Sequence, residues 1–125
     1  MAEMAKKILI IEDDLGLARI LSDILTKEQF AVSIAKDGEE GLEKAFRESP
    51  DLIFLDIQLP RMRGTVFLEQ LRKDKRGTKI PVIVLSNLDD IDTVSKTLEG
   101  NVMHFFVKAD MNLSDLVNKT KELLG

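Results

Sequence analysis

The amino-acid sequence predicts one α/β domain, built as a parallel β-sheet with helices on both faces. Short runs that are apolar at every position, such as residues 8–11 and 52–55, are typical of strands covered on both sides. Stretches with apolar residues at helical spacing, such as residues 17–24, follow these runs. Because strands and helices alternate along the chain with short connections, we expect the strands to run parallel.

The composition is that of an ordinary globular domain. The chain has 125 residues, of which 44% are hydrophobic and 32% are charged, so it is long enough to bury a core. We expect a single domain over residues 1–125, with its core at about residues 7–124. The net charge of -4 does not indicate direct binding to nucleic acid. The absence of cysteine excludes disulfides, thiolate metal ligands and a cysteine nucleophile.

The N-terminus does not resemble a targeting segment. Two lysines are followed by a run of four apolar residues that ends at Glu12, which is too short for the apolar region of a signal peptide. No apolar run in the sequence has the length needed to span a membrane. We therefore expect a cytoplasmic protein with no membrane contact.

The first half of the chain is expected to contain three strands and two helices. Asp14 and Asp37 each precede apolar residues at helical spacing, which is the position of a helix cap. Pro50 ends the second helix. The expected elements are a strand at 8–11, a helix after Asp14, a strand at 30–35, a helix from Asp37 and a strand at 52–56.

The second half repeats this alternation after a loop at residues 60–64. The charged run at residues 72–77 is expected to be a solvated helix end. Pro81 lies near the start of a strand, where a missing backbone donor is tolerated. The expected elements are a helix around 67–71, a strand at 80–85, a helix around 91–98, a strand at 102–107 and a helix at 113–124.

Five strands with right-handed crossovers leave few possible sheet orders. The flavodoxin-like order 2-1-3-4-5 is the commonest at this chain length, and it gives a doubly wound (βα)5 fold. In that order the first and third strands are neighbours, and ligands bind where these strands end.

Polar residues stand where four of the predicted strands end. Glu12 and Asp13 follow the first strand, Asp56 ends the third, Ser86 ends the fourth and Lys108 ends the fifth. Parallel strands end at the same edge of a sheet, so we expect these side chains to converge there. Three crowded carboxylates repel one another and raise a pKa unless a cation is present. Oxygen ligands without cysteine favour a hard ion such as Mg²⁺.

The same set of residues indicates phosphoryl transfer. Lys108 would place a compact positive charge beside an anionic group bound next to the metal. Ser86 would donate a hydrogen bond to that group. A carboxylate nucleophile together with a metal, a lysine and a hydroxyl is suited to forming an acyl phosphate on Asp56.

These residues resemble those of a response regulator receiver domain of two-component signalling, and the resemblance extends from residue 7 to residue 124. It is carried by the acidic residues 12–14, by Asp56 followed by Pro60 and Gly64, and by Ser86 and Lys108. The resemblance implies that Asp56 is the phosphoacceptor, with Ser86 and Lys108 assisting. It implies that Mg²⁺ is held by Glu12, Asp13, Asp56 and the backbone carbonyl of Gln58. A histidine kinase or histidine phosphotransfer protein would be the donor.

The resemblance also implies a conformational switch and a mode of action. Phe105, three residues before Lys108, is at the position of the family's switch aromatic. Phosphorylation would draw Ser86 toward the phosphoryl group and turn the ring inward. The face formed by the fourth helix, fifth strand and fifth helix would then change for partner binding or phosphorelay. We expect a stand-alone receiver that catalyses its own phosphorylation and dephosphorylation, with no separate substrate to turn over.

Four features depart from the usual receiver pattern. Ala109 stands where the family has a proline after a cis bond, and a non-proline cis bond costs roughly 2.5 to 4 kcal/mol, so we expect a trans or unusually flexible loop. Asn87 replaces a small residue and is placed to crowd or hydrogen-bond the phosphoryl site. Phe105 lacks the hydroxyl of the commoner tyrosine. Gln58 and Leu88 take the positions that flank the attacking water, which suggests altered dephosphorylation kinetics.

Three alternatives stay open at this point. The first is a degenerate receiver that binds proteins without accepting phosphate; Ala109 favours it, while Asp56 and Lys108 weigh against it. The second is a haloacid-dehalogenase-like phosphatase, which would need an Asp-x-Asp motif after the first strand that residues 12–14 do not supply. The third is a flavodoxin-like FMN carrier, which would need a phosphate-binding loop after the first strand; the acidic residues there would repel a phosphate, and aromatic residues to sandwich the flavin are scarce.

Overall fold

The structure is a computed structural model that describes residues 5–87 and 104–125. The helix expected around residues 91–98 and the first part of the strand expected from residue 102 lie outside the described residues, as does Leu88. The strands are β1 (Lys7–Ile11), β2 (Ala31–Ala35), β3 (Leu52–Asp56), β4 (Val82–Ser86) and β5 (His104–Val107). The helices are α1 (Leu15–Lys27), α2 (Gly38–Glu48), α3 (Gly64–Lys73) and α5 (Leu113–Leu124), with a 3-10 turn η2 (Lys108–Asp110).

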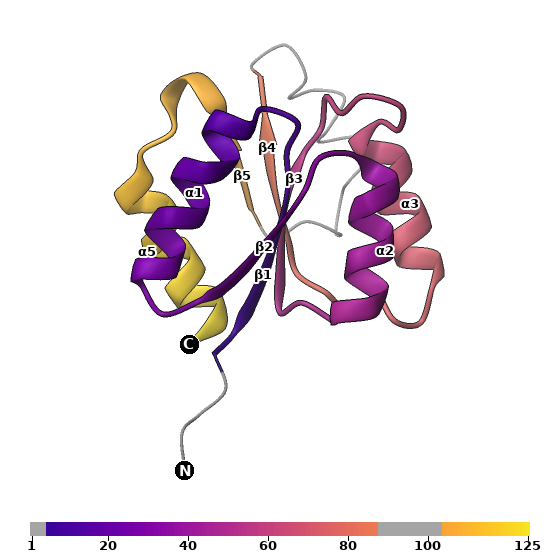
Figure 1. Ribbon diagram of the computed structural model, residues 1–125, viewed down its shortest axis with the longest axis horizontal. Helices are drawn as coiled ribbons and strands as arrows, with labels where there is room; N and C mark the ends of the chain where they lie inside the picture. The colour runs from indigo at the N-terminus through magenta and orange to yellow at the C-terminus, as the bar shows by residue number, and fades with distance from the viewer. Residues whose placement is uncertain (1–4, 88–103) are drawn as a thin grey trace.

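The five strands form one parallel sheet in the order β2-β1-β3-β4-β5, which confirms the predicted order. Helices α1 and α5 cover one face of the sheet, and α2 and α3 cover the other (Figure 1). β3 is the central strand and all five of its residues are buried. The strand ends that carry the predicted site residues therefore lie at one edge of a sheet that has described helices on both faces.

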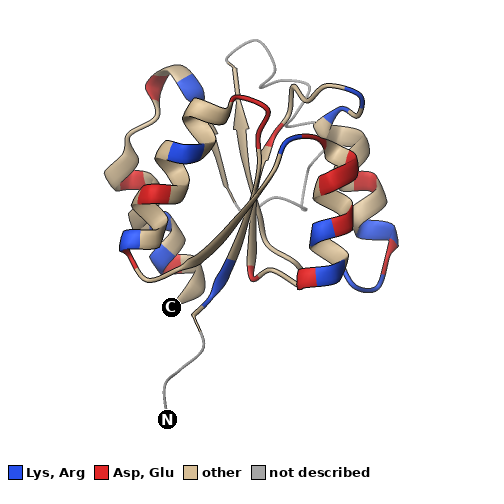
Figure 2. Ribbon diagram, in the orientation of Figure 1, with Lys and Arg blue, Asp and Glu red and all other residues tan. Residues whose placement is uncertain are grey.

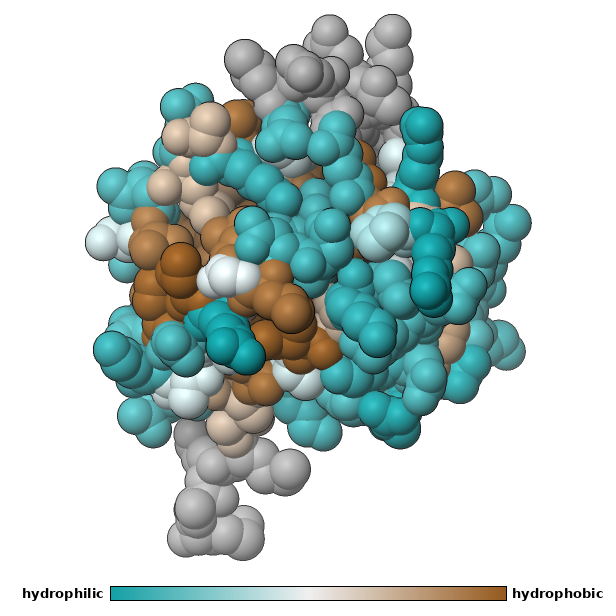
Figure 3. Space-filling model, turned by 45° about the horizontal axis from the view of Figure 1, so that its top comes forward, coloured by the Kyte–Doolittle hydropathy of each residue, from teal (hydrophilic) through white to brown (hydrophobic). Residues whose placement is uncertain are grey.

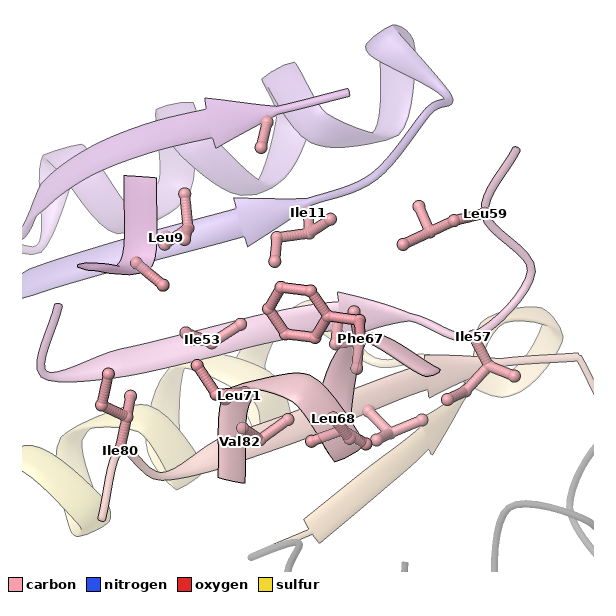
Figure 4. Packing of buried hydrophobic residues seen from close by; sticks show 14 residues of the cluster. Leu9, Ile11, Ile53, Ile57, Leu59, Phe67, Leu68, Leu71, Ile80 and Val82 are labelled. Carbon is pink, nitrogen blue, oxygen red and sulfur yellow. The ribbon is translucent and has the colours of Figure 1, made fainter. Parts of the chain in front are cut away.

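Side-chain alternation along β3 explains why residues 52–55 are apolar at every position. Leu52 and Phe54 point to one face, where they join a cluster with residues of α1 and α5. Ile53 and Leu55 point to the other face and pack with Phe67 and other residues of α3 (Figure 4). The strand is thus buried on both sides, and its register with its neighbours is fixed by packing.

The two predicted aspartate caps are confirmed. Asp14 Oδ1 accepts a hydrogen bond of 3.2 Å from the backbone N–H of Leu17 at the start of α1. Asp37 Oδ1 accepts one of 2.8 Å from the N–H of Glu40, whose own carboxylate accepts from the N–H of Lys36 at 2.9 Å. Both helices therefore begin within a few residues of the strand that precedes them.

The described surface is mostly polar, with an apolar area visible on the face shown in Figure 3. None of the described helices combines the length and apolar character needed to cross a bilayer. Among the described residues, the exposed large apolar side chains are Leu15, Ile20, Val66 and Phe105.

Candidate functional site

The carboxyl ends of the strands bring the predicted polar residues to one edge of the sheet. Glu12 directly follows β1, Asp56 is the last residue of β3, and Ser86 is the last residue of β4. Lys108 directly follows β5 and begins η2. Figure 2 shows acidic residues in red where β1 and β3 end. The parallel sheet thus gathers residues that are far apart in the sequence.

Lys108 links two of the carboxylates. Its Nζ lies 2.6 Å from Glu12 Oε1 and 3.2 Å from Asp56 Oδ2. The side chains of Glu12 and Asp56 are 0% and 3% exposed, whereas that of Lys108 is 22% exposed. The Lys108–Ala109 peptide bond is trans, in agreement with one of the two expectations for this loop. The ammonium group therefore contacts two buried carboxyl groups from a partly exposed position.

The two buried carboxyl groups have opposite pKa shifts. Burial, together with the neighbouring Asp56, raises the pKa of Glu12 to about 8, although Lys108 opposes this shift. Burial acts to raise the pKa of Asp56 as well, but contacts with Glu12, the Gln58 N–H and Lys108 lower it below its usual range. Of the two carboxyl groups, Glu12 is therefore the more readily protonated and Asp56 the more readily ionised.

The pKa of Lys108 is raised despite its partial burial. Burial alone would lower it, but the hydrogen bond with Glu12 and the charges of Asp56 and Glu12 outweigh that effect. Lys108 therefore stays a cation at the pH where Asp56 is an anion. An anionic group brought to Asp56 would meet a fixed positive charge.

Glu12, Asp13 and Asp56 form a group of ligands suited to a hard cation. Each offers one carboxylate oxygen, and these atoms all lie within 4.8 Å of one another. Asp13 is exposed, so the group is open to solvent on one side. Glu12 Oε2 is buried and has no hydrogen-bond partner among the described residues. A buried carboxylate oxygen with no partner beside two further carboxylates fits a metal ligand set.

The end of β4 contributes a second buried polar atom without a partner. Ser86 is 0% exposed, and its Oγ makes no hydrogen bond within the described part of the chain. Ser86 pairs with Val107 in the sheet, and the preceding Leu85 pairs with Asp56. The hydroxyl is therefore held next to the strand ends that carry Asp56 and Lys108.

Two of the departures identified in the sequence contact each other. Asn87 Nδ2 donates a hydrogen bond of 2.7 Å to Gln58 Oε1. The backbone N–H of Gln58 also donates to Asp56 Oδ1 at 3.0 Å. The sequence predicts that Asn87 crowds or hydrogen-bonds the phosphoryl site, and this stays a prediction; in the structure its amide bonds the side chain of Gln58, which lies two residues after Asp56. The adjacency of β3 and β4 was the signal that could have revealed this pair.

Phe105 lies on β5 and its side chain is among the exposed apolar groups, at 38% relative exposure.

A cavity of about 510 Å³ lies next to Asp13 and the loop between β3 and α3. Its lining includes Asp13, Gln58, Arg63 and Thr65.

Comparison with known proteins identifies the class. The family model of the response regulator receiver domain matches residues 8–121. The chain therefore belongs to the receiver domains of two-component signalling. Its similarity extends to the Bacillus subtilis (strain 168) alkaline phosphatase synthesis transcriptional regulatory protein PhoP, with 39% identity over 132 residues, covering 96% of this chain and 54% of PhoP.

Solved structures agree with this assignment. A CheY-like receiver domain protein from Methanospirillum hungatei JF-1 superposes with a TM-score of 0.82 at 30% identity, covering 95% of this chain and 93% of that one. The receiver domain of sensor histidine kinase PA1611 from Pseudomonas aeruginosa PAO1 has a TM-score of 0.85 at 20% identity, with 98% and 99% coverage, and it has a magnesium ion coordinated in its active-site cleft. The chain spans 7% to 54% of the lengths of the first curated relatives it matches.

Proposed function

We propose that this chain is a phosphoacceptor switch in which Asp56 receives a phosphoryl group from a phosphohistidine. The donor would be a histidine kinase or a histidine phosphotransfer protein. The observation that carries the proposal is the contact of Lys108 Nζ with both Glu12 and the ionised Asp56 at a buried sheet edge. That arrangement offers a carboxylate nucleophile and a fixed cation on the same side of the sheet.

The reaction moves a phosphoryl group from nitrogen to oxygen. An oxygen of Asp56 attacks phosphorus, a P–O bond forms and the P–N bond to the donor imidazole breaks. Its electron pair stays with the imidazole nitrogen. Lys108 and the Ser86 hydroxyl stabilise the phosphoryl oxygens, and the product is an acyl phosphate on Asp56. The transfer is catalysed by the receiver's own residues, as is the later hydrolysis.

Mg²⁺ would be held by Glu12, Asp13, Asp56 and the backbone carbonyl of Gln58, and would supply positive charge to the phosphoryl oxygens. The carboxylate oxygens within 4.8 Å of one another and the unpartnered Glu12 Oε2 support this ligand set. The magnesium ion in the cleft of the PA1611 receiver domain supports it by analogy.

The switch would be driven by contacts that exist only after phosphorylation. The buried Ser86 Oγ has no hydrogen-bond partner among the described residues, and the Phe105 side chain is partly exposed. In the proposed switch the hydroxyl bonds a phosphoryl oxygen and the ring turns inward. A change of this kind would alter the face of β5 and α5 for partner binding or phosphorelay. The Gln58–Asn87 hydrogen bond would be positioned to affect how water reaches the phosphoryl group.

The test is the intact mass of the protein after incubation with Mg²⁺ and acetyl phosphate. We expect one phosphoryl adduct that needs Mg²⁺ and is lost in Asp56→Asn. Asp51→Asn is the matched control, because Asp51 lies just before the opposite end of β3 and should keep the adduct. An adduct that persists in Asp56→Asn would contradict the proposal. No adduct, and no Mg²⁺-dependent binding of beryllofluoride, would favour the degenerate, phosphate-independent receiver.

A further inference from the structure

The loop between α3 and β4 lies at the edge of the sheet opposite to Asp56, and it is held by its own side chains. Nη1 of Arg72 donates to the backbone carbonyls of Gly77 and Ile80, each at 2.8 Å, and of Thr78 at 3.2 Å. Thr78 Oγ1 donates to the Asp74 carbonyl at 2.9 Å. Surface loops are usually the more mobile and less bonded parts of a domain. This one has its backbone fixed.

The fixed loop presents positive charge. Residues 72–79 contain five of the chain's 18 lysines and arginines but one of its 22 acidic residues. Figure 2 shows these basic residues in blue at the end of α3 and in the loop that follows it. Lys75, Arg76 and Lys79 are exposed, and within the described ranges neither lysine takes part in an ion pair.

Arg76 is the most firmly placed of these cations. Its guanidinium group lies over the ring of Phe46, with Cζ 4.3 Å from the ring centroid. Its Nε and Nη2 donate to the two carboxylate oxygens of Asp74 at 3.0 and 2.7 Å. The planar group therefore has a set orientation, and its Nη1 makes no hydrogen bond within the described part of the chain.

A depression of about 500 Å³ lies between the cations and an apolar floor. Lys75, Arg76 and Lys79 contribute to its lining together with Pro50, Ile80 and Pro81. We name these six residues the basic cradle. Asp51 also borders the depression, but its Oδ2 accepts a hydrogen bond from the backbone N–H of Lys7 at 2.8 Å.

We propose that the basic cradle is a docking site for an acidic peptide segment of a partner protein. Carboxylates of the segment pair with Lys75, Lys79 and Arg76, and an apolar side chain between them packs on the prolines. Because the loop is already fixed by Arg72 and Asp74, binding does not have to order it.

An acidic peptide fits this surface better than nucleic acid does. The cations occupy the length of one loop, and outside residues 72–79 acidic residues outnumber basic ones in the chain. Asp51 at the border adds a nearby carboxylate. A long polyphosphate backbone would meet repulsion on either side of the loop, whereas a short peptide is confined to the cradle.

The site is independent of the proposed phosphorylation, because it lies at the other end of the strands. Peptide docking at the cradle is therefore expected to be the same in wild type and Asp56→Asn. Failure of phosphoryl transfer would leave the cradle proposal standing, and failure of docking would leave Asp56 unaffected.

The test is a titration of the ¹⁵N-labelled chain followed by amide chemical shifts. The probe is the acetylated pentapeptide Glu-Glu-Leu-Glu-Glu at low salt, with Gln-Gln-Leu-Gln-Gln as its neutral match. We expect the acidic peptide to shift the amides of residues 75–80 and the neutral one to shift none of them. Lys75→Gln combined with Lys79→Gln should weaken binding roughly threefold to tenfold, the range for two exposed ion pairs.

The control is Lys6→Gln combined with Lys36→Gln, which removes the same charge from exposed lysines elsewhere. An equal loss of binding in this control, or shifts that map outside the cradle, would overturn the proposal. So would tighter binding of an oligothymidine at the same amides, which would assign the surface to nucleic acid. Shifts at these amides on concentrating the protein alone would assign it to a second copy of the chain, and would equally overturn the proposal.

Discussion

Polar groups are hydrogen-bonded to different extents at the two ends of the strands. We call the end that carries Asp56 the Asp56 edge, and the end that carries the loop between α3 and β4 the cradle edge. At the Asp56 edge, carboxyl groups are buried together and compete for one lysine. At the cradle edge, Arg72 and Asp74 satisfy the backbone of the loop between α3 and β4 with short hydrogen bonds. Among the described residues, the two buried side-chain atoms without a partner, Glu12 Oε2 and Ser86 Oγ, both lie at the Asp56 edge. The fold leaves polar groups unsatisfied where a ligand is proposed to bind and satisfies them where the chain must be held.

The largest expected effect comes from removing the hydrogen bonds that hold the cradle edge. Arg72→Met keeps much of the apolar stem but leaves the carbonyls of Gly77, Thr78 and Ile80 without this donor. We expect the free energy of unfolding to fall by about 2 to 3 kcal/mol, the range for hydrogen bonds from a charged donor. Urea denaturation measures this change.

Arg47→Met is the matched control, because Arg47 bonds the exposed Glu43 and the half-buried Glu48 on α2 and its side chain is 57% exposed. Its loss should change the free energy of unfolding by roughly 0.5 kcal/mol. Similar losses in the two variants would mean that the cradle edge is not specially held.

A second way to disturb the cradle edge is to add one methyl group. A Cβ at Gly77 would lie 2.5 Å from both Cδ1 and the carbonyl oxygen of Leu71, and the backbone oxygen cannot move aside easily. We expect Gly77→Ala to lower the free energy of unfolding by about 1 to 3 kcal/mol. Gly16→Ala should cost less, because its nearest atom is Asp14 Oδ1 at 3.3 Å, a side-chain atom that needs to move by only a few tenths of an ångström, and alanine favours the helix. Thermal denaturation of the two variants separates the outcomes.

At the Asp56 edge, in contrast, replacing a buried polar group should stabilise the protein. The pKa of Glu12 rises from 4.5 to about 8 on folding, so the folded state binds more protons than the unfolded state between these pH values. Stability should therefore fall as the pH rises through this window in metal-free solution. Glu12→Gln removes the titrating group and should raise the free energy of unfolding by about 1 kcal/mol at pH 8, because the lost contact with Lys108 offsets part of the relief.

Urea denaturation between pH 5 and pH 8 in the presence of a chelator measures this effect. A Glu12→Gln variant that is less stable than wild type at pH 8 would show that the buried carboxyl group stabilises the fold. Polar groups would then be stabilising at both edges, and the contrast in stability between them would be absent. Asp23→Asn, a change at an exposed position of α1, should leave the pH dependence of wild type intact.

The smallest expected effect is a change in the stability of the protein at acid pH, caused by Asp74 at the cradle edge. The hydrogen bonds from Arg76 lower the pKa of Asp74 from 3.8 to about 2. Its contribution to stability is present above the unfolded pKa and is lost as the pH falls toward 2. Asp74→Asn should therefore flatten the loss of stability between about pH 4 and pH 2, as measured by acid titration of the circular dichroism signal. If the variant and wild type lose the same stability between about pH 4 and pH 2, the ion pair of Asp74 with Arg76 does not stabilise the fold.

Sequence reasoning located the strands and caps because local patterns determine them. The doubly buried β3 follows from apolar residues at every position, and Asp14 and Asp37 are recognisable as caps from their immediate neighbours. The order of the strands followed from chain length and crossover handedness. With the order known, the convergence of Glu12, Asp56 and Lys108 follows from where each strand ends.

Long-range side-chain geometry was beyond the sequence. Lys108 lies closer to Glu12, 96 positions away, than to Asp56, and no local pattern fixes that choice. Residues 72–77 were expected to be a solvated helix end, and that was wrong for part of the run. Arg72 folds back onto loop carbonyls and Gly77 is buried against Leu71, because loop carbonyls without sheet partners attract the nearest guanidinium.

The limited burial of β5 has a consequence for how the site opens. No residue of β5 is fully buried, whereas every residue of β3 is, yet β5 leads directly into Lys108. Strands with few buried contacts open in local unfolding events that need less free energy than global unfolding. We therefore expect the segment that carries Lys108 to open more readily than β3. Native-state hydrogen exchange should show β5 amides exchanging faster than those in β3. A ligand that binds Lys108 should slow the amide exchange of β5 more than that of any other strand.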